Sequence, residues 1–66
     1  MKNNIKVERA ILNITQDDLA KKIGVSRQTI NTMESGKYVP STALALKMAQ
    51  VFGVSVEELF QLEEED

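Results

Sequence analysis

Residues 27–32, RQTINT, form a polar segment in which five of the six side chains can donate or accept hydrogen bonds and none is negatively charged. Arginine pairs with guanine, glutamine or asparagine pairs with adenine, and a threonine methyl contacts thymine. The segment therefore has side chains suited to base edges in a DNA major groove: Arg27, Gln28, Thr29, Asn31 and Thr32. A polar helix face is ordinarily only solvated, so this interpretation depends on the elements that hold the segment.

Two short helices are predicted before this segment, and a third is predicted to contain it. No glycine or proline interrupts residues 4–12, which predicts a first helix. Thr15 can cap a second helix, which ends at Gly24, a residue that readily takes positive φ. Ser26 can cap a third helix over Arg27–Glu34. The polar segment is thus expected to begin the third helix.

The remainder of the chain predicts two more helices. A fourth helix over Thr42–Phe52 has a buried stripe at helical spacing, made of Leu44, Ala45, Met48, Ala49 and Phe52. Ser55 caps a short fifth helix that extends through about residue 60, and residues 61–66 are expected to be frayed or to form a short strand. The sequence predicts a single all-α domain over residues 1–66, built as a compact five-helix bundle.

The second and third predicted helices form a helix-turn-helix over residues 16–34. Ala20 allows the two helices to approach closely, and Gly24 makes a sharp turn that costs most other residues about 1–2 kcal/mol. Ile30 and Met33 are expected to face the core. Their burial turns the polar side chains of the third helix outward, which favours a recognition surface over a merely solvated face.

Composition excludes most catalytic chemistry. The 66 residues contain no cysteine and no histidine, so the usual zinc ligands and the usual general base near neutral pH are missing. The carboxylate pairs Asp17–Asp18 and Glu57–Glu58 each lie in the first turn of a predicted helix, where capping and the helix dipole explain them. We therefore expect no enzyme activity, metal, cofactor or small-molecule ligand. No signal peptide or membrane span is recognisable, and a cytoplasmic location is expected.

Charge is unevenly distributed along the chain, although the net charge is only −2. Residues 1–38 carry seven basic and four acidic side chains, a balance of +3, whereas residues 39–66 carry one basic and six acidic side chains, a balance of −5. A basic N-terminal part beside an acidic C-terminal part is compatible with polyanion binding on one face, and it also arises by chance in neutral domains.

From about residue 5 to residue 60 the chain resembles the Cro/cI-type, or XRE-family, helix-turn-helix transcriptional regulators. The motifs that carry the resemblance are Thr15-Gln16, Leu19-Ala20, Ile23 to Asn31, Glu34, Gly36-Lys37-Tyr38, Pro40-Ser41 and Val54 to Phe60. It is most similar to the smallest stand-alone members. One of these, a repressor of similar length, adds a two-stranded sheet from its termini and binds DNA as a homodimer, so the resemblance implies a short sheet from the termini as an addition to the bundle.

The resemblance implies roles for individual residues. Gln16 matches a residue at the start of the second helix that anchors to a phosphate, and residues 26–31, beginning with Ser26, match the recognition helix. Lys37 and Tyr38 match a loop that reaches the sugar-phosphate backbone. The implied partner is double-stranded DNA, bound by a homodimeric repressor at a palindromic operator.

Other matches and departures concern structure. Arg9 and Glu34 match an ion pair between the first and third helices, the alternative being two unpaired surface charges. Relatives usually carry charged residues where this chain has Ile11 and Leu12, which either pack against the C-terminal segment or form an extra contact surface. The acidic residues 63–66 either solubilise the chain or keep the far face away from DNA.

The last segment is predicted to form the dimer interface, because it is more apolar than a single small core requires. The expected interface residues are Val56, Leu59, Phe60 and Leu62. The alternative is that all four close the core of one protomer. A different class of function is also possible: a protein-interaction module, such as an antitoxin or adaptor, that uses the same scaffold to hold a protein.

Overall fold

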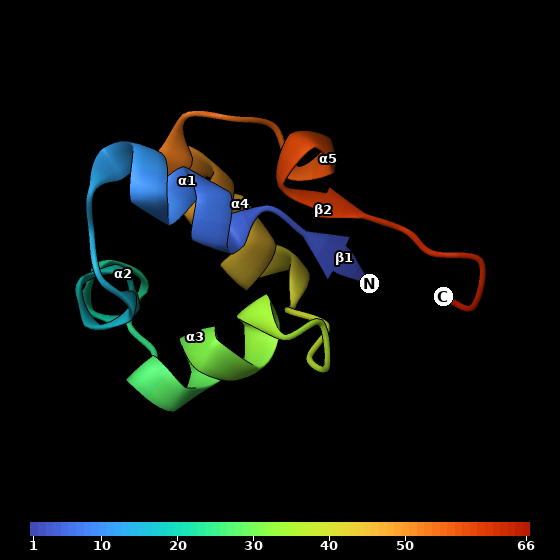
Figure 1. The fold of residues 1–66 in the computed structure, drawn as a ribbon, viewed down its shortest axis with the longest axis horizontal. Coiled ribbons are helices and arrows are strands. Elements are labelled where there is room, and N and C mark those ends of the chain that lie inside the picture. Colours follow the sequence, from blue (N-terminus) through green and yellow to red (C-terminus); the bar gives the residue numbers. More distant parts are fainter.

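The computed structural model describes all 66 residues as five helices and one two-stranded sheet (Figure 1). In chain order the elements are β1 (Lys2–Asn3), α1 (Ile5–Leu12), α2 (Gln16–Ile23), α3 (Arg27–Glu34), α4 (Thr42–Phe52), α5 (Val56–Leu59) and β2 (Phe60–Gln61). The predicted fold, a compact helical bundle with a short sheet from the termini, is confirmed.

Local capping fixes where the helices begin. The hydroxyls of Thr15, Ser26, Ser41 and Ser55 each accept a hydrogen bond from the backbone N–H three residues later. These bonds satisfy donors that have no partner inside the helix. The helix boundaries therefore follow from short sequence signals, which is why four of the five starts could be predicted.

The core lies between α1, α4 and the α2–α3 pair. Each helix contributes at least one buried residue, and the side chains with less than 2% exposure are Ile5, Leu19, Ile30, Met33, Met48 and Leu59. Two of these, Ile30 and Met33, belong to α3 and attach it to the rest of the molecule. Their burial determines which face of α3 remains outside.

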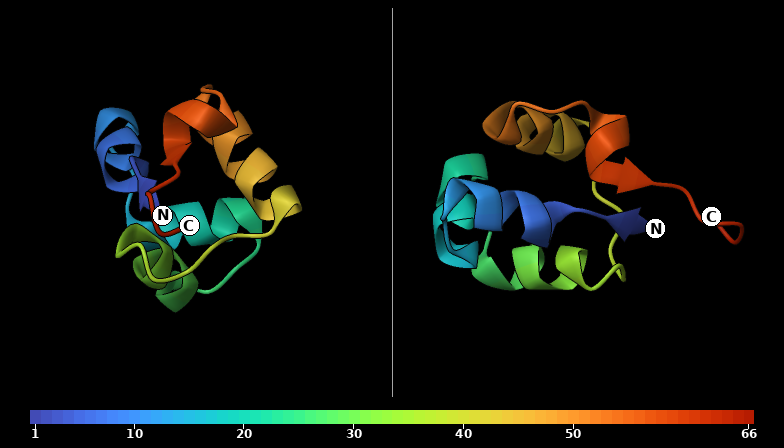
Figure 2. Two further views of the ribbon diagram at one scale, coloured as in Figure 1. Left: turned by 90° about the vertical axis from the view of Figure 1, so that its right-hand side faces the viewer. Right: turned by 45° about the horizontal axis from the view of Figure 1, so that its top comes forward.

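The sheet ties the two ends of the chain together. β1 and β2 are antiparallel, with Asn3 opposite Phe60, and the N–H of Asn4 donates to the carbonyl of Leu59 at 2.9 Å. Phe60 is therefore extended (φ −125°, ψ 135°), and the fifth helix ends at Leu59, one residue earlier than predicted. Figure 2 shows both termini at the same end of the molecule, away from α2.

The segment beyond β2 folds back toward the chain start. Side-chain oxygens of Glu63 and Asp66 lie 3.3 and 3.4 Å from the amino group of Met1. Of the two expectations for residues 61–66, the short strand is correct for Gln61 only.

Candidate nucleic-acid interface

The α2–α3 unit has helix-turn-helix geometry. Three residues separate the two helices, and Gly24, the first of them, has φ 79°, in the left-handed region that favours glycine. Ala20 is 2% exposed, and Ile30 and Met33 are almost fully buried. The small residue, the turn and the two inward side chains thus occupy the positions predicted for them.

Burial of one side of α3 leaves a polar face on the other. Arg27, Gln28 and Asn31 are exposed, whereas Thr29 and Thr32 are half-buried. The α3 polar face, defined as these five residues, carries one positive charge and no negative charge. Its exposed part therefore has the donors and acceptors that base edges require.

The hydroxyls of this face are already used within the helix. Ser26 Oγ accepts from the N–H of Thr29 at 3.1 Å and shares a hydrogen bond with the Thr29 hydroxyl at 2.9 Å. The Thr32 hydroxyl donates to the carbonyl of Gln28 at 2.9 Å. The two threonine hydroxyls are thus engaged within the chain, and the exposed polar side chains of the face are Arg27, Gln28 and Asn31.

An ion pair braces α3 against α1. Arg9 Nε and Nη2 donate to the two carboxylate oxygens of Glu34 at 2.6 and 3.1 Å, and Arg9 Nη1 donates to the carbonyl of Ile14 at 3.1 Å. The hydrogen bond to Glu34 raises the pKa of Arg9 above its usual value. The structure contains the pair expected from the sequence, and the forked geometry fixes both side chains.

Gln16 connects this ion pair to the polar face. Its Nε2 donates to Glu34 Oε1 at 3.1 Å and to Asn31 Oδ1 at 3.3 Å. Because both contacts use the side-chain nitrogen, little donor capacity remains there for a phosphate. The sequence identified Gln16 and Asn31 separately but gave no sign of the contact between them, since it depends on how α2 crosses α3.

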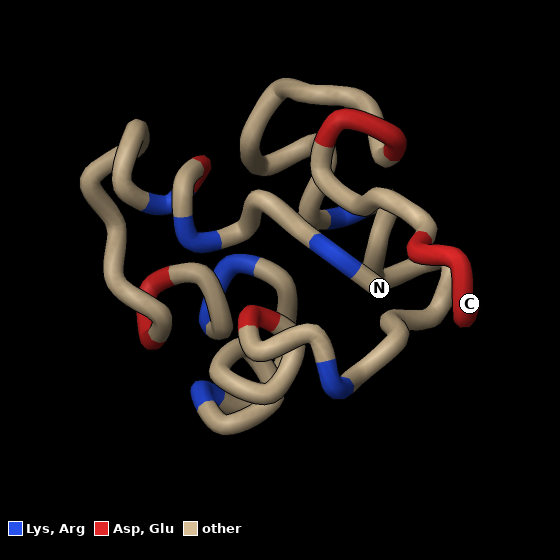
Figure 3. Tube along the Cα trace, turned by 45° about the vertical axis from the view of Figure 1, so that its right-hand side comes forward, with Lys and Arg blue, Asp and Glu red and all other residues tan.

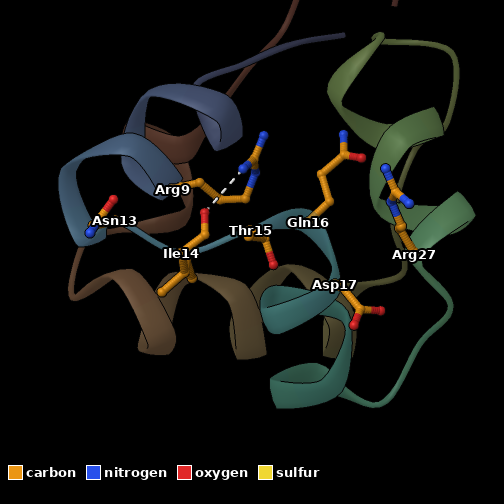
Figure 4. Close-up of a pocket in the computed structure, with 7 residues that line it drawn as sticks. All are labelled: Arg9, Asn13, Ile14, Thr15, Gln16, Asp17 and Arg27. Carbon is orange, nitrogen blue, oxygen red and sulfur yellow. Dashed lines mark hydrogen bonds between the residues drawn. The ribbon is translucent and has the colours of Figure 1, made fainter.

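A polar notch of about 570 Å³ lies beside this network (Figure 4). Arg9 from α1, Gln16 and Asp17 from the start of α2, and Arg27 from the start of α3 line it, together with the connection before α2. Of its two guanidinium groups, that of Arg9 is engaged by Glu34 and Ile14. Arg27 is the cation in the notch that has no hydrogen bond or ion pair within the chain.

The loop between α3 and α4 holds the other predicted contacts. Lys37 and Tyr38 are exposed, and neither side chain makes a hydrogen bond within the chain. Gly36, just before them, has φ 81°, and a Cβ there would lie 3.2 Å from the carbonyl oxygen of Met1. A glycine is therefore required where the loop passes the N-terminal strand.

Charge is separated in space as well as along the chain. Six of the ten acidic side chains follow residue 56. Figure 3 shows these acidic segments on α5 and the C-terminal tail, apart from the α2–α3 side. The electrostatic field thus favours a polyanion on the α2–α3 side over the tail side.

Two of the four predicted interface residues belong to the core. Leu59 is fully buried and Phe60 is 8% exposed, whereas Val56 is half-buried and Leu62 is 80% exposed. The expectation that Leu59 forms an intermolecular contact is wrong, because packing against the core covers its side chain completely. The core alternative holds for Leu59 and largely for Phe60.

An apolar groove of about 290 Å³ runs beside these residues. Its lining is mostly hydrophobic and comes from the chain start, the loop before α4, α4, α5, the start of β2 and the residue after β2: Met1, Pro40, Thr42, Ala45, Leu46, Val56, Glu57, Phe60 and Leu62. Leu46, which is 51% exposed, was not among the residues predicted for this surface. The sequence could have indicated it, because this leucine lies outside the buried stripe of α4 and is therefore expected to face outward.

The unusual apolar residues of α1 are largely exposed. Ile11 is 69% exposed and Leu12 is 45% exposed. This exposure favours the second of the two expectations for them, an extra contact surface.

The structure has neither a cluster of metal-binding side chains nor a membrane-spanning helix. No group of three or more histidine, cysteine, aspartate or glutamate side chains is arranged to hold a metal ion. No helix combines the length and apolar character that a membrane-spanning segment requires.

Comparisons with known proteins agree with this geometry. A family model described as helix-turn-helix matches residues 5–59. An uncharacterized HTH-type transcriptional regulator of Methanocaldococcus jannaschii is 56% identical over 66 residues, covering both chains completely. The HTH-type regulator YgzD of Bacillus subtilis is 46% identical over 66 residues, again covering both chains. The fold is similar to that of a hypothetical transcription factor from Neisseria, with a TM-score of 0.78, 24% identity and coverage of 94% of this chain and 71% of the other.

Proposed function

The chain belongs to the XRE family of helix-turn-helix transcriptional regulators, and on that premise we propose that it is a homodimeric repressor of a palindromic operator. Each protomer inserts the α3 polar face into one of two successive major grooves. The half-sites lie about 34 Å apart, or 10–10.5 base pairs. Repression follows because a bound dimer occludes the duplex that it covers.

The exposed polar face of α3 is the observation that carries this proposal. Arg27, Gln28 and Asn31 project from a helix whose opposite side is held in the core by Ile30 and Met33. A rigid helix with exposed donors and acceptors can pair with base edges at little cost in conformational entropy.

Phosphate contacts supply affinity from either side of this face. On one side, the exposed Lys37 and Tyr38 are suited to contact the sugar-phosphate backbone of a DNA strand. On the other side, Gln16 lies in the first turn of α2, where backbone N–H groups lack partners within the helix. Because its side-chain nitrogen is engaged by Glu34 and Asn31, we assign the phosphate contact of Gln16 to its backbone.

The apolar groove is the proposed contact between protomers. Leu46 and Leu62 are exposed at its edges, Val56 is half-buried, and none carries a charge. A second copy placed against the groove removes these side chains from water. Removal of exposed apolar side chains from water is the driving force for this contact.

In vitro selection of bound double-stranded oligonucleotides tests the DNA proposal directly. We expect an enriched palindrome with half-sites one helical turn apart, and binding that weakens steeply with salt. If no oligonucleotide is enriched, no duplex is shifted in a gel, and the protein instead forms a stoichiometric complex with another protein, the protein-interaction module is supported. Placing the selected site over a promoter in a reporter then separates repression from activation.

Sedimentation of Leu62→Glu tests the dimer. This side chain is 80% exposed in one protomer, so the charge is expected to leave the fold intact and to release monomers. Val7→Glu is the matched control, because Val7 is 55% exposed on α1 and lies outside the groove. Equal dissociation by both variants, or by neither, contradicts the assignment of the groove.

A further inference from the structure

The orientation of one amide on α3 is set by a chain of hydrogen bonds that starts at α1. Arg9 donates to both carboxylate oxygens of Glu34, at 2.6 and 3.1 Å. A carboxylate paired in this way accepts hydrogen bonds and has none to donate. Any group placed against Glu34 must therefore present a donor.

Gln16 is that group. Its Nε2 lies 3.1 Å from Glu34 Oε1. With the amide turned over, its oxygen would face the carboxylate and two acceptors would meet without a hydrogen between them. The charge of Glu34 thus decides which end of the Gln16 amide faces α3.

Asn31 receives the second N–H of the same nitrogen. Asn31 Oδ1 lies 3.3 Å from Gln16 Nε2, so the Asn31 oxygen is turned toward α2. Its Nδ2 is at the other end of the amide, makes no hydrogen bond within the chain, and belongs to an exposed residue. The donor end of Asn31 is consequently the end left for a ligand.

We propose that Gln16 orients the Asn31 amide so that Asn31 acts as a hydrogen-bond donor to the DNA and favours guanine or thymine over adenine at one position of each half-site. Guanine offers two adjacent acceptors, O6 and N7, and thymine offers O4, whereas adenine sets its N6 donor beside its one acceptor, N7, so that the donor end of Asn31 meets another donor there. The usual pairing of asparagine with adenine needs its oxygen to accept from N6, and here that oxygen is turned toward α2, where it accepts from Gln16. Gln16 is a positioning residue for base selection, an inference that rests on the proposed DNA binding.

Selection experiments with variants test the inference. Asn31→Ala first identifies the base position whose preference depends on this side chain. At that position the unmodified protein is expected to enrich guanine or thymine about tenfold over adenine. Gln16→Met removes the donor and keeps the length, and it is expected to reduce this ratio to near unity while the other positions of the site stay selected.

A rescue and a control complete the design. Gln16→Lys supplies a donor to both Glu34 and Asn31 and is expected to keep the preference, with uniformly tighter binding from the added charge. Gln50→Met makes the same chemical change on an exposed residue of α4 and is expected to change nothing. Circular dichroism confirms that each variant is folded.

Specific outcomes overturn the inference. Enrichment of adenine by the unmodified protein at the Asn31-dependent position contradicts it, and so does a folded Gln16→Met variant with an unchanged preference. Both outcomes leave sequence-specific DNA binding intact. Failure to enrich any sequence contradicts the proposed function itself, so the two failures are distinguishable.

Discussion

The α2–α3 unit and the segment from α5 to the C-terminus expose opposite chemistry from the same core. On α3, burial of Ile30 and Met33 leaves a polar face with a positive charge. In the C-terminal segment, burial of Leu59 leaves Leu62 exposed beside acidic side chains. The core residue types are alike, so the outward residues and not the core determine what each region can bind.

The regions also differ in how their geometry is specified. Within the α2–α3 unit the caps and the turn involve residues three or four positions apart, as in the bond from the Asp18 N–H to the Thr15 hydroxyl. The C-terminal segment depends on partners from the opposite end of the chain, as in the pairing of Asn3 with Phe60. Local signals are visible in a sequence, whereas a partner more than fifty residues away is not.

The largest expected effect is on the free energy of unfolding, and it distinguishes a core residue from a surface residue within the C-terminal segment. Leu59→Ala should destabilise the protein by about 2–5 kcal/mol, because it removes a fully buried side chain and leaves a cavity. Leu62→Ala should change the free energy of unfolding of the protomer by less than about 0.5 kcal/mol. Urea denaturation at a concentration where both variants are monomeric measures the difference. Similar losses would mean that Leu62 also supports the core.

This contrast shows why two of the four predicted interface residues lie in the core. An apolar residue near a chain end looks the same in sequence whether it packs inward or outward. Leu59 is inward because the Asn4 N–H bonds its carbonyl and fixes that turn against α1. Neither Asn4 nor the two-residue strands have a pattern that predicts this contact from composition or periodicity.

More of the helix-turn-helix than of the C-terminal segment could be predicted from the sequence. Ala20, Gly24, Ile30 and Met33 have spacings that allow few other arrangements, and the structure places each as expected. The contact from Gln16 to Asn31 could not be predicted, because it requires the crossing of α2 over α3 and the fixed position of the ion pair. Sequence therefore identified the candidate site but not the orientation of its side chains.

The second prediction compares a largely buried ion pair with an exposed one. Arg9→Ala leaves the Glu34 carboxylate, whose side chain is 8% exposed, without its charged partner and should cost about 1.5–3 kcal/mol. Lys21→Ala breaks the pair with Asp17, in which the side chains are 78% and 57% exposed, and should cost about 0–0.5 kcal/mol. Thermal denaturation of both variants checks this ranking. Equal costs would mean that the Arg9 pair does not brace α3.

DNA binding supplies the third contrast, between the α3 polar face and its flanking loop. Gln28→Ala should weaken binding to a selected operator by about 1–3 kcal/mol and relax one base preference. Lys37→Ala should weaken binding to all DNA sequences alike, and it should lower the slope of the binding constant against salt concentration by about one ion. Titrations of the operator and of a scrambled duplex at several salt concentrations distinguish them. A sequence-specific loss in Lys37→Ala would place base recognition in the loop.

A smaller effect compares the same capping motif in both regions. Thr15 at α2 and Ser55 at α5 each form a capping box, with Asp18 and Glu58 respectively. Thr15→Ala and Ser55→Ala should each cost about 1 kcal/mol, which for a domain of this size lowers the melting temperature by about 4–8 °C. Only Thr15→Ala should also weaken DNA binding, because α2 carries Gln16. Equal losses of affinity would remove that distinction between the regions.

The smallest effect concerns the carboxylate in the α2 capping box. The backbone N–H of Thr15 donates to Asp18 at 3.0 Å and, with the Thr15 hydroxyl, lowers the pKa of Asp18 below its usual value of 3.8. A lowered pKa in the folded state stabilises the fold above the pKa of the unfolded chain, and this contribution disappears as the pH falls through the folded value. Because the carboxylate is fully exposed, the effect should be slight. The melting temperature of the unmodified protein should fall more between pH 5 and pH 3 than that of Asp18→Asn, whereas Asp17→Asn should behave like the unmodified protein, since no such bond holds Asp17. An identical pH response in all three would show that the carboxylate of Asp18 adds nothing to the start of α2.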